Sequence, residues 1–477
     1  MGIKFKRMKF LTVTAFLLLP YFVFCQPVKD RLRSAFTAIE KDEQFKHALI
    51  SLYVVESKTG AVIFDNNAQV GMAPASTQKV ITSVSAFELL GKDFRYNTSI
   101  GYDGTVAAKQ LQGDLIISGS GDPTLGSWRW PSTSTQKVVG RIVEALQQKN
   151  ITGIKGSVLA SLGNWETQAT PRGWTWEDMG NYYGAGAWGL NWHENQYRLI
   201  LQPGKSVGDN VKLVKTEPSI LDKINLRNEV TTGPAGSGDN SIIYLSEYGT
   251  NGFVRGTVPA GKENFTIKGA LPVPYQVLLD DIENEAIANG IKIGERPGKI
   301  EEYASASTAP AKIINTLLQI QSPSLDSINY WFLRESINLY GEAFVKSIAL
   351  KQKGFAATDS GLAIIRFFWS SRGIDKAAMN IKDGSGLSPS NRITTNALVT
   401  VLQYARERSW YNSFYNALPL MNGIKMKSGY INGVRSYTGY IKSKSGDTYT
   451  FAFIVNNFDG NPGSVREKMW RVLDILK

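Results

Sequence analysis

Cysteine and histidine are almost missing from this chain of 477 residues, which has one cysteine and two histidines. The single thiol, Cys25, can form no internal disulfide bond. His47 and His193 cannot supply a zinc site of three histidines. We therefore expect a fold stabilised by packing, with no metal ion and no cofactor.

The scarcity of histidine also restricts the kinds of serine hydrolase, because a Ser-His-Asp enzyme would have to use one of these two side chains. His47 enters a predicted strand over residues 49–55 and is interpreted as structural. His193 ends the aromatic segment 188–193, and the chain has no G-x-S-x-G motif to supply its partner serine. If the protein is a serine hydrolase, its predicted base is therefore a lysine.

The amino terminus has the layout of a secretory signal peptide. An apolar run over residues 10–24 is shorter than the roughly 20 residues that span a membrane. Four basic residues precede this run: Lys4, Lys6, Arg7 and Lys9. We expect residues 1–25 to be a signal peptide cleaved before Gln26, with lipid attachment at Cys25 as the alternative. The mature protein is then predicted to be exported and periplasmic.

Length and charge give broader expectations. The chain is too long for one ordinary hydrophobic core, so two or three domains are expected. The formal net charge of +12 stays positive after the signal peptide is removed. A basic surface suits attraction to an anionic polymer such as the cell wall, and a merely soluble basic surface explains it equally well. No motif supports binding of nucleic acid.

A Ser-x-x-Lys spacing puts a serine and a lysine on one face of a helix, as a serine enzyme with a lysine base requires. The tetrapeptide Ser-Thr-Gln-Lys occurs twice, at 76–79 and at 134–137. The second copy opens a predicted helix over 138–148 from a polar loop and is explained as a helix N-cap. The first opens the apolar helix 80–90 directly after a predicted hairpin over 51–65. Burial is what an activated pair needs, so Ser76 and Lys79 are preferred.

Two further motifs accompany Ser-x-x-Lys in penicillin-binding proteins and class A β-lactamases, namely Ser-x-Asn and Lys-[Ser/Thr]-Gly. Each occurs in several copies, at 327–329 and 336–338 for the first and at 58–60, 427–429 and 444–446 for the second. The copies at 58–60 and 444–446 join apolar runs and are predicted to be hairpin turns. The copy at 427–429 ends a predicted strand that would pair with residues 436–441, so it is the one that could line a groove.

Longer strings in the sequence resemble the low-molecular-mass penicillin-binding proteins of the D-Ala-D-Ala carboxypeptidase/endopeptidase type, peptidase family S13. The resemblance covers most of the mature chain and is strongest in three strings: Gly113 to Leu125, Ser322-Pro323-Ser324-Leu325, and Asp383-Gly384-Ser385-Gly386-Leu387-Ser388. In that family the Ser-Pro-x-Leu string leads to the second motif and an Asn-Leu-x-x-Glu run. This selects Ser336 and Asn338, with Glu342 ending the run. The sequence departs from the family at Ile337, often acidic or polar in relatives, and at Ser428, often threonine.

The resemblance implies an α+β fold with a split penicillin-binding/β-lactamase-like domain, in which helices cover an antiparallel sheet. Two smaller domains are inserted in it. The implied limits are 26–90 and 305–477 for the catalytic domain, 91–165 and 282–304 for domain II, and 166–281 for domain III.

The resemblance also implies roles for single residues. Ser76 is the nucleophile, Lys79 its base, Ser336 the proton relay to the departing amine, and Asn338 orients Lys79 and the substrate amide. A supporting place near the groove is implied for the string 383–388. The third motif and its neighbour are implied to bind substrate: Lys427, Ser428, Gly429 and Tyr430. Lys427 and Ser428 hold the terminal carboxylate, while the N–H groups of Ser76 and Tyr430 form the oxyanion hole.

The implied activity is that of a serine D-Ala-D-Ala carboxypeptidase or DD-endopeptidase acting on peptidoglycan stem peptides, with β-lactams as covalent inhibitors. Two alternatives share the motifs. A β-lactamase is usually a compact single domain, which the long insertion disfavours. A catalytically silent peptidoglycan-binding protein is disfavoured by the intact set of motif residues.

Overall fold

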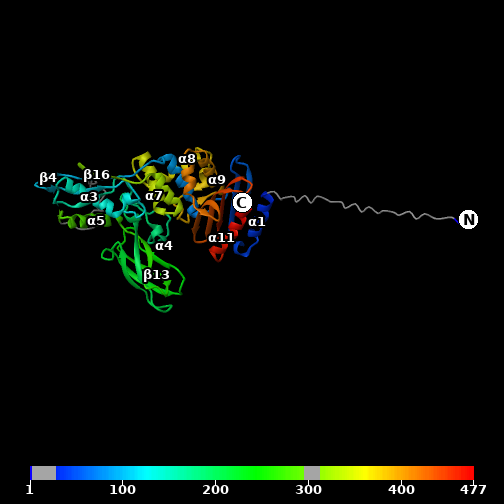
Figure 1. Ribbon diagram of the computed structural model, residues 1–477, viewed down its shortest axis with the longest axis horizontal. Coiled ribbons are helices and arrows are strands. Elements are labelled where there is room, and N and C mark those ends of the chain that lie inside the picture. The colour runs from blue at the N-terminus through cyan, green and yellow to red at the C-terminus, as the bar shows by residue number, and fades with distance from the viewer. Residues whose placement is uncertain (3–27, 295–311) are drawn as a thin grey trace.

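The computed structural model describes residues 1–2, 28–294 and 312–477 (Figure 1). Residues 3–27, which contain most of the predicted signal peptide and its cleavage point, lie outside the described residues, as do residues 295–311, which contain the predicted domain limit between 304 and 305. Within the described ranges, none of the helices has the length and apolar character that crossing a membrane requires.

A six-stranded antiparallel sheet brings together the two ends of the described chain. Its strand order is β19-β20-β21-β22-β1-β2. The strands are β1 (Leu49–Glu56), β2 (Val62–Asn66), β19 (Leu420–Met421), β20 (Ile424–Ile431), β21 (Val434–Lys442) and β22 (Thr448–Asn456). The predicted hairpin is formed by β1 and β2, and the predicted pairing of the Lys427 strand is that of β20 with β21, where Lys427 lies opposite Thr438.

The apolar pattern of these strands follows from their place in the sheet. β22 is central, and every residue from Tyr449 to Val455 is buried, because helices cover both of its faces. β2 lies at an edge and buries only Phe64. The buried run of the central strand is therefore apolar except for Thr450, whereas the edge strand leaves Val62 and Asp65 exposed.

Helices cover the two faces of the sheet unequally. One face is covered by the two terminal helices, α1 (Val28–Glu40) and α11 (Pro462–Leu473), which pack together through residues such as Phe36 and Met469. The other face is covered by a larger group, with α7 to α9 on the opposite side of the sheet in Figure 1. This group comprises α2 (Lys79–Leu89), α6 (Leu325–Arg334), α7 (Asn338–Lys353), α8 (Thr358–Ser370), α9 (Thr395–Arg406) and α10 (Tyr411–Ala417).

The innermost of these helices is α2, in which every residue from Lys79 to Phe87 is buried. Its apolar residues are mixed with small buried polar residues such as Thr82 and Ser85, and the helix is enclosed on all sides. It contacts α6, α7 and α9. Its first residue is therefore a lysine placed in the protein interior.

The described part of the chain between α2 and α6 builds a second, inserted region with four small sheets and its own core. Two four-stranded sheets contain β3 (Asn97–Tyr102), β4 (Thr105–Ala107), β5 (Gln110–Gln112), β6 (Leu115–Ser118), β7 (Gly153–Ile154), β8 (Val158–Ser161), β15 (Lys292–Ile293) and β16 (Asn315–Gln321). Two three-stranded sheets contain β9 (Gln196–Gln202), β10 (Lys212–Glu217), β11 (Asn225–Gly233), β12 (Asn240–Tyr244), β13 (Asn251–Pro259) and β14 (Phe265–Ala270). Three helices accompany them: α3 (Thr135–Gln148), α4 (Trp176–Met179) and α5 (Pro274–Ala288).

The domain limits remain a prediction, and two elements of this region make contacts across them. β16 falls in the segment 305–477 that was assigned to the catalytic domain, yet it pairs with β3. Most of α5 falls in the predicted domain III, and it packs on α3, β8 and β15. One core cluster runs through the whole region, from Ile100 and Leu146 to Val254.

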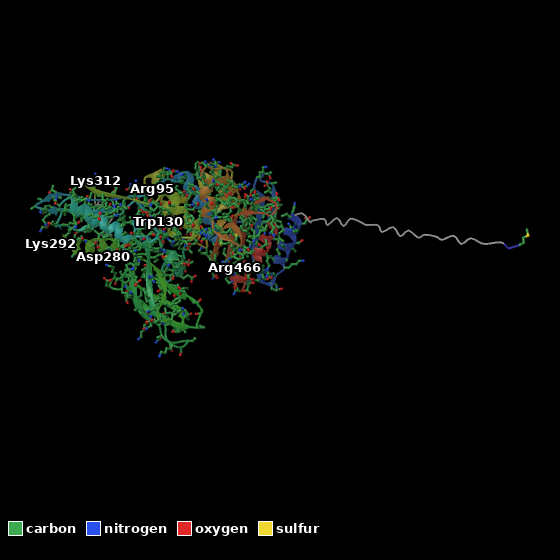
Figure 2. All side chains as sticks on the ribbon, in the orientation of Figure 1. Arg95, Trp130, Asp280, Lys292, Lys312 and Arg466 are labelled. Carbon is green, nitrogen blue, oxygen red and sulfur yellow. The ribbon has the colours of Figure 1, made fainter. Side chains whose placement is uncertain are left out.

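The arrangement in space confirms the α+β fold, with an antiparallel sheet covered by helices. Figure 1 shows α3, α5 and β16 at the end of the molecule remote from α1 and α11, with β13 in a lobe that projects to one side. The basic residues Arg95, Lys292, Lys312 and Arg466 lie at separate places along the long axis (Figure 2). Positive charge is therefore present at both ends of the molecule.

Candidate active site

Ser76 and Lys79 are positioned by a tight turn that leads into α2. Ser76 lies in the 3₁₀ turn Ala75–Gln78, and Lys79 is the first residue of the helix. Ala75 has a φ of +47°, a conformation that costs a non-glycine residue about 1–3 kcal/mol. Its carbonyl packs against Gly386, where a Cβ atom would overlap it. The strained turn is therefore held by the segment that contains Gly386.

The Lys79 side chain makes three polar contacts. Its Nζ atom lies 3.0 Å from Ser76 Oγ, 2.6 Å from Asn338 Oδ1 and 2.7 Å from the carbonyl oxygen of Ser385. The last two oxygens can only accept hydrogen bonds. A neutral amine that donates its two hydrogens to them keeps its lone pair for the Ser76 hydroxyl.

The surroundings of Lys79 favour that neutral amine. Burial lowers the pKa of Lys79 well below its ordinary value, and the charge of Lys427 acts in the same direction, while Asp383 and Glu342 oppose it. The amino-terminal end of α2 also disfavours a positive charge at its first residue. Burial likewise lowers the pKa of Lys427, to about 7. Both lysines can therefore lose their protons far more readily than a lysine in water.

Ser336 and Asn338 lie at the junction of α6 and α7. Ser336 is half-buried and has a φ of +58°, which turns the chain sharply between the two helices. Asn338 is the first residue of α7 and brings its Oδ1 atom to Lys79. The structure thus joins Asn338 to Lys79 directly, whereas among the described residues no hydrogen bond joins Ser336 to either Ser76 or Lys79. Ile337, the departure from the family, packs against the helical core.

A contact that the sequence did not predict fixes the Asn338 amide. Its Nδ2 atom donates to the carbonyl oxygen of Tyr183 at 2.7 Å. Because that carbonyl accepts only from the nitrogen side of the amide, Oδ1 must face Lys79. Tyr183 therefore orients Asn338 through its backbone, and no side-chain pattern could have indicated it.

The third motif lies on β20, whose edge faces the turn that carries Ser76. Lys427 is buried and its Nζ atom donates to the Ser428 carbonyl at 2.9 Å, while Ser428 is half-buried and Tyr430 is exposed. A Cβ atom on Gly429 would lie 2.8 Å from the backbone nitrogen of Ser76. Only glycine at this place lets β20 approach the serine so closely.

The string Asp383–Ser388 forms a buried turn directly beneath Lys79. Asp383 accepts a hydrogen bond from Trp174 Nε1 at 2.9 Å and from Gln78 Nε2 at 3.0 Å. Trp174 belongs to the inserted region and Gln78 to the Ser76 turn. The supporting place predicted for this string is therefore a structural junction, and it supplies the Ser385 carbonyl to Lys79.

Polar residues of α7 hold the inserted region against this site. Tyr340 Oη donates to Glu194 Oε1 at 2.7 Å, and Glu194 also pairs with Arg129. Lys346 Nζ lies 2.9 Å from the carbonyl oxygen of Ala187 and 3.3 Å from Glu166 Oε1. The inserted chain near Tyr183 is thus anchored on both sides of its contact with Asn338.

The second Ser-Thr-Gln-Lys string lacks the features of the first. Lys137 is exposed, whereas Lys79 is buried. Ser134 occupies the predicted N-cap position of α3, but its hydroxyl makes no capping hydrogen bond and contacts the Pro131 carbonyl at 3.2 Å. The predicted N-cap position of the second string is therefore confirmed, but the cap lacks a side-chain hydrogen bond because the Ser134 hydroxyl donates back to the preceding turn.

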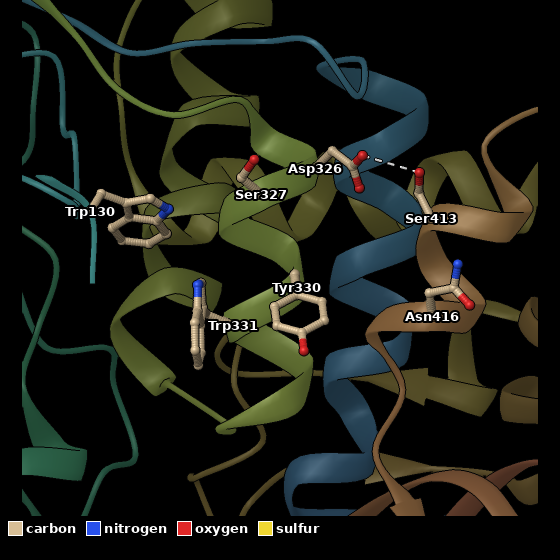
Figure 3. A pocket seen from close by; sticks show the side chains of 7 residues that line it. All are labelled: Trp130, Asp326, Ser327, Tyr330, Trp331, Ser413 and Asn416. Atoms are coloured by element: carbon tan, nitrogen blue, oxygen red, sulfur yellow. Dashed lines mark hydrogen bonds between the residues drawn. The ribbon is translucent and has the colours of Figure 1, made fainter. Parts of the chain in front are cut away.

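The other copies of the motifs are also separated from Ser76. Residues 58–60 and 444–446 are turns between β1 and β2 and between β21 and β22, as predicted. Ser327 lies on the outer side of α6 and lines an open pocket of about 440 Å³ between α6 and α10 (Figure 3). Its neighbours there include the rings of Trp130, Tyr330 and Trp331. None of the lining residues is one of the predicted catalytic residues.

Neither histidine is part of the site. His47 is exposed just before β1. His193 Nε2 lies 3.7 Å from Asp281 Oδ2 on α5, and Trp192 Nε1 donates to the same carboxylate. The structural interpretation of His47 and the exclusion of a Ser-His pair are consistent with these positions.

Comparison with known proteins agrees with this geometry. A sequence model of the D-Ala-D-Ala carboxypeptidase 3 (S13) family matches residues 32–474. The D-alanyl-D-alanine carboxypeptidase of Actinomadura sp. (strain R39) is 25% identical over 460 residues, which cover 90% of this chain and 82% of that protein. D-alanyl-D-alanine carboxypeptidase DacB of Haemophilus influenzae is 20% identical over 420 residues, 83% of each chain.

Solved structures show the same fold. The crystal structure of penicillin binding protein 4 (dacB) from Haemophilus influenzae superposes with a TM-score of 0.76 at 18% identity, covering 94% of this chain and 99% of that one. A second structure of that protein, in complex with a β-lactam, gives a TM-score of 0.71. With the family match over almost the whole described chain, these findings show that the protein belongs to the D-Ala-D-Ala carboxypeptidase 3 (S13) family of serine peptidases.

Proposed function

We propose that Ser76, Lys79, Ser336 and Asn338 form the catalytic centre of an exported serine D-Ala-D-Ala carboxypeptidase and DD-endopeptidase. Its substrates are peptidoglycan stem peptides, and β-lactams acylate its serine. The observation that carries this proposal is the buried Lys79 amine, held by two acceptors with its remaining contact directed at Ser76 Oγ. A cleavable signal peptide ending at Cys25 would deliver the enzyme to its substrate.

In the first step the neutral Lys79 amine takes the proton of Ser76 as Oγ attacks the carbonyl carbon of the penultimate D-alanine. A bond forms between Oγ and that carbon, and the carbonyl oxygen becomes negative. The backbone N–H groups of Ser76 and Tyr430 are the proposed oxyanion donors, each of which typically contributes about 2.7–4 kcal/mol. The approach of β20 to Ser76 at Gly429 supports this pairing.

In the second step the bond from the carbonyl carbon to the leaving nitrogen breaks. The proton held by Lys79 passes to that nitrogen through the Ser336 hydroxyl, which leaves an acyl group on Ser76. A water molecule then attacks the same carbon and gives a proton to Lys79. The bond between that carbon and Ser76 Oγ breaks, the proton passes from Lys79 to Oγ, and the shortened peptide leaves as a carboxylic acid. The half-buried place of Ser336 beside the first residue of α7 supports this role.

Substrate orientation depends on β20. In the described chain β19 pairs with β20 only at Leu420 and Met421, so beyond Lys425 the same edge of β20 faces the Ser76 turn. An extended stem peptide can add to such an edge as a further strand. Lys427 and Ser428 would then hold the terminal carboxylate, an attraction that requires Lys427 to be protonated.

Digestion of purified peptidoglycan tests the proposal. We expect release of free D-alanine from pentapeptide stems, cleavage of cross-linked dimers, or both, and loss of these products with Ser76→Ala. Rapid turnover of benzylpenicillin without cleavage of peptidoglycan would instead identify a β-lactamase. A protein that binds peptidoglycan and is neither acylated nor active would be the silent form.

A further inference from the structure

Glu342 is a fully buried acidic residue that the proposed mechanism does not use. It lies on α7 four residues after Asn338, and therefore on the same face of the helix. Its Oε2 atom accepts a hydrogen bond from the N–H group of Gly384 at 2.8 Å. Its Oε1 atom is buried and has no hydrogen-bond partner among the described residues.

Gly384 directly precedes the residue whose carbonyl accepts from Lys79. Lys79 Nζ lies 2.7 Å from the Ser385 carbonyl oxygen, and Thr82 Oγ1 donates to the Gly384 carbonyl at 2.6 Å. The turn is therefore held from α2 by Thr82 and from α7 by Glu342. Gly384 and Gly341 pack so closely that a Cβ atom on either would contact the other's carbonyl oxygen. Movement of this turn would carry the Ser385 carbonyl away from Lys79.

The hydrogen bonds of Glu342 differ from those of the neighbouring Asp383. The Asp383 carboxylate accepts from five groups: Gln78 Nε2, Trp174 Nε1, Asn391 Nδ2 and the backbone N–H groups of Gly386 and Ser388. The Glu342 carboxyl group accepts one backbone hydrogen bond, from Gly384, and interacts with one further donor, the Ser385 hydroxyl. Several donors stabilise an ionised carboxylate, whereas a buried carboxyl group with few donors beside another negative charge favours its neutral form.

The electrostatic balance agrees with this contrast. Burial raises the pKa of Glu342 to about 8, and the charge of Asp383 raises it further, against the opposing effects of Gly384, Ser385 and Lys79. Three charged or titratable groups interact with Glu342. Lys79 comes from α2, Asp383 from the turn 383–388, and Lys346 lies farther along α7.

We propose that Glu342 is a positioning residue for Lys79: as a neutral carboxyl group it anchors Gly384 and thereby holds the Ser385 carbonyl against the Lys79 amine. This inference rests on the proposed function, since it assigns Glu342 a purpose only if Lys79 is the base. A neutral Glu342 leaves Lys79 free to lose its proton. An ionised Glu342 would draw Lys79 into its ammonium form and reduce the amount of base.

Two substitutions separate the anchor from the charge. Glu342→Gln keeps an oxygen acceptor for Gly384 and cannot ionise, whereas Glu342→Leu removes the acceptor. Rates of acylation by a fluorescent penicillin would be measured from pH 5.5 to 9.5 for each, together with thermal unfolding. The matched control is Ser347→Ala, which alters a buried hydroxyl on the same helix that contacts Tyr96 and Ala343.

Below pH 7 we expect Glu342→Gln to acylate within about threefold of the wild type, because both side chains are neutral there. Above pH 8 it should acylate faster than the wild type, whose Glu342 is then ionised. Glu342→Leu should acylate at least about tenfold more slowly at every pH, because a buried N–H group loses its acceptor. Ser347→Ala should keep the wild-type pH profile.

The inference is overturned if Glu342→Gln loses tenfold or more at pH 6.5 with unchanged thermal unfolding, since the charged form would then be required. It is also overturned if Glu342→Leu acylates at the wild-type rate. Failure of the proposed function gives a different result, namely that the wild type is not acylated or that Lys79→Arg is acylated normally.

Discussion

Lys79 Nζ lies 3.0 Å from Ser76 Oγ, at the start of a helix that is buried from Lys79 to Phe87. A charged ammonium group in such a place is costly, so the lysine is stable there mainly as a neutral amine. Burial lowers the pKa of Lys79, and the resulting neutral amine can act as a base.

The identity of the nucleophile can be tested against the second Ser-Thr-Gln-Lys string. A labelled penicillin should modify the peptide that contains Ser76, and Ser134→Ala should leave this labelling intact, because Lys137 is exposed and lacks the buried setting of Lys79. Mass spectrometry of the digested adduct locates the label. Labelling that survives Ser76→Ala and disappears with Ser134→Ala would reverse the assignment.

The pH profile of acylation should be bell-shaped. Its rising limb follows loss of the proton from Lys79. Burial, together with the charge of Lys427, lowers the pKa of Lys79 well below the ordinary value. Its falling limb, near pH 7 in the free enzyme, follows loss of the Lys427 proton that attracts the substrate carboxylate. Lys79→Arg should reduce acylation by at least about 10²-fold, because arginine stays protonated.

Further variants test the assignment of the two limbs to Lys79 and Lys427. Lys427→Arg should move the falling limb to higher pH and keep the rising limb. Replacing His47 and His193 together should preserve the whole profile in a folded protein. A folded His193 variant that cannot be acylated, beside a normal Lys79→Arg variant, would contradict a lysine base.

Burial of Lys427 should also be visible as pH-dependent stability. The folded state binds the proton with a pKa of about 7 and the unfolded chain with the ordinary value of about 10.4, so stability rises with pH between these values. Lys427→Met should increase the free energy of unfolding by roughly 1–4 kcal/mol at pH 6. The gain should shrink towards pH 10.5. Denaturant unfolding at both pH values measures this, and equal destabilisation at each would refute it.

Ser336 has a strained backbone conformation and is proposed to relay a proton, and two substitutions separate these two properties. Ser336→Ala and Ser336→Gly both remove the hydroxyl and should lower turnover of a D-Ala-D-Ala peptide by about 10²-fold. Only glycine relieves the φ of +58°, so Ser336→Gly should be the more stable variant by about 1 kcal/mol. Peptide hydrolysis and thermal unfolding give the two readouts. Wild-type turnover in either variant would remove Ser336 from the proton path.

Processing at the amino terminus is predicted to occur between Cys25 and Gln26. The intact mass of protein exported in a bacterial host should correspond to a chain that begins at Gln26. A mass increased by two or three acyl chains on Cys25 would show the lipoprotein alternative and contradict a soluble periplasmic enzyme.

Much of this architecture could be predicted from local patterns. The hairpin of β1 and β2, the pairing of β20 with β21 and the helices that follow both Ser-Thr-Gln-Lys strings all follow from apolar runs separated by turns. Apolar runs and turns can be recognised in this way because they depend on residues that are close together in the sequence. Choosing Ser336 over Ser327 needed the longer family strings, since a three-residue motif occurs by chance.

The sequence by itself determined which residue types are available for the chemistry: two histidines, no pairable cysteine, and serine and lysine at the spacing of one helical turn. The tertiary structure alone decided that Lys79 is buried while Lys137 is exposed, because burial depends on helices contributed from distant parts of the chain. It also brought the carbonyls of Tyr183 and Ser385 to Asn338 and Lys79. Every residue has a backbone carbonyl, so only the folded chain determines which one meets the base.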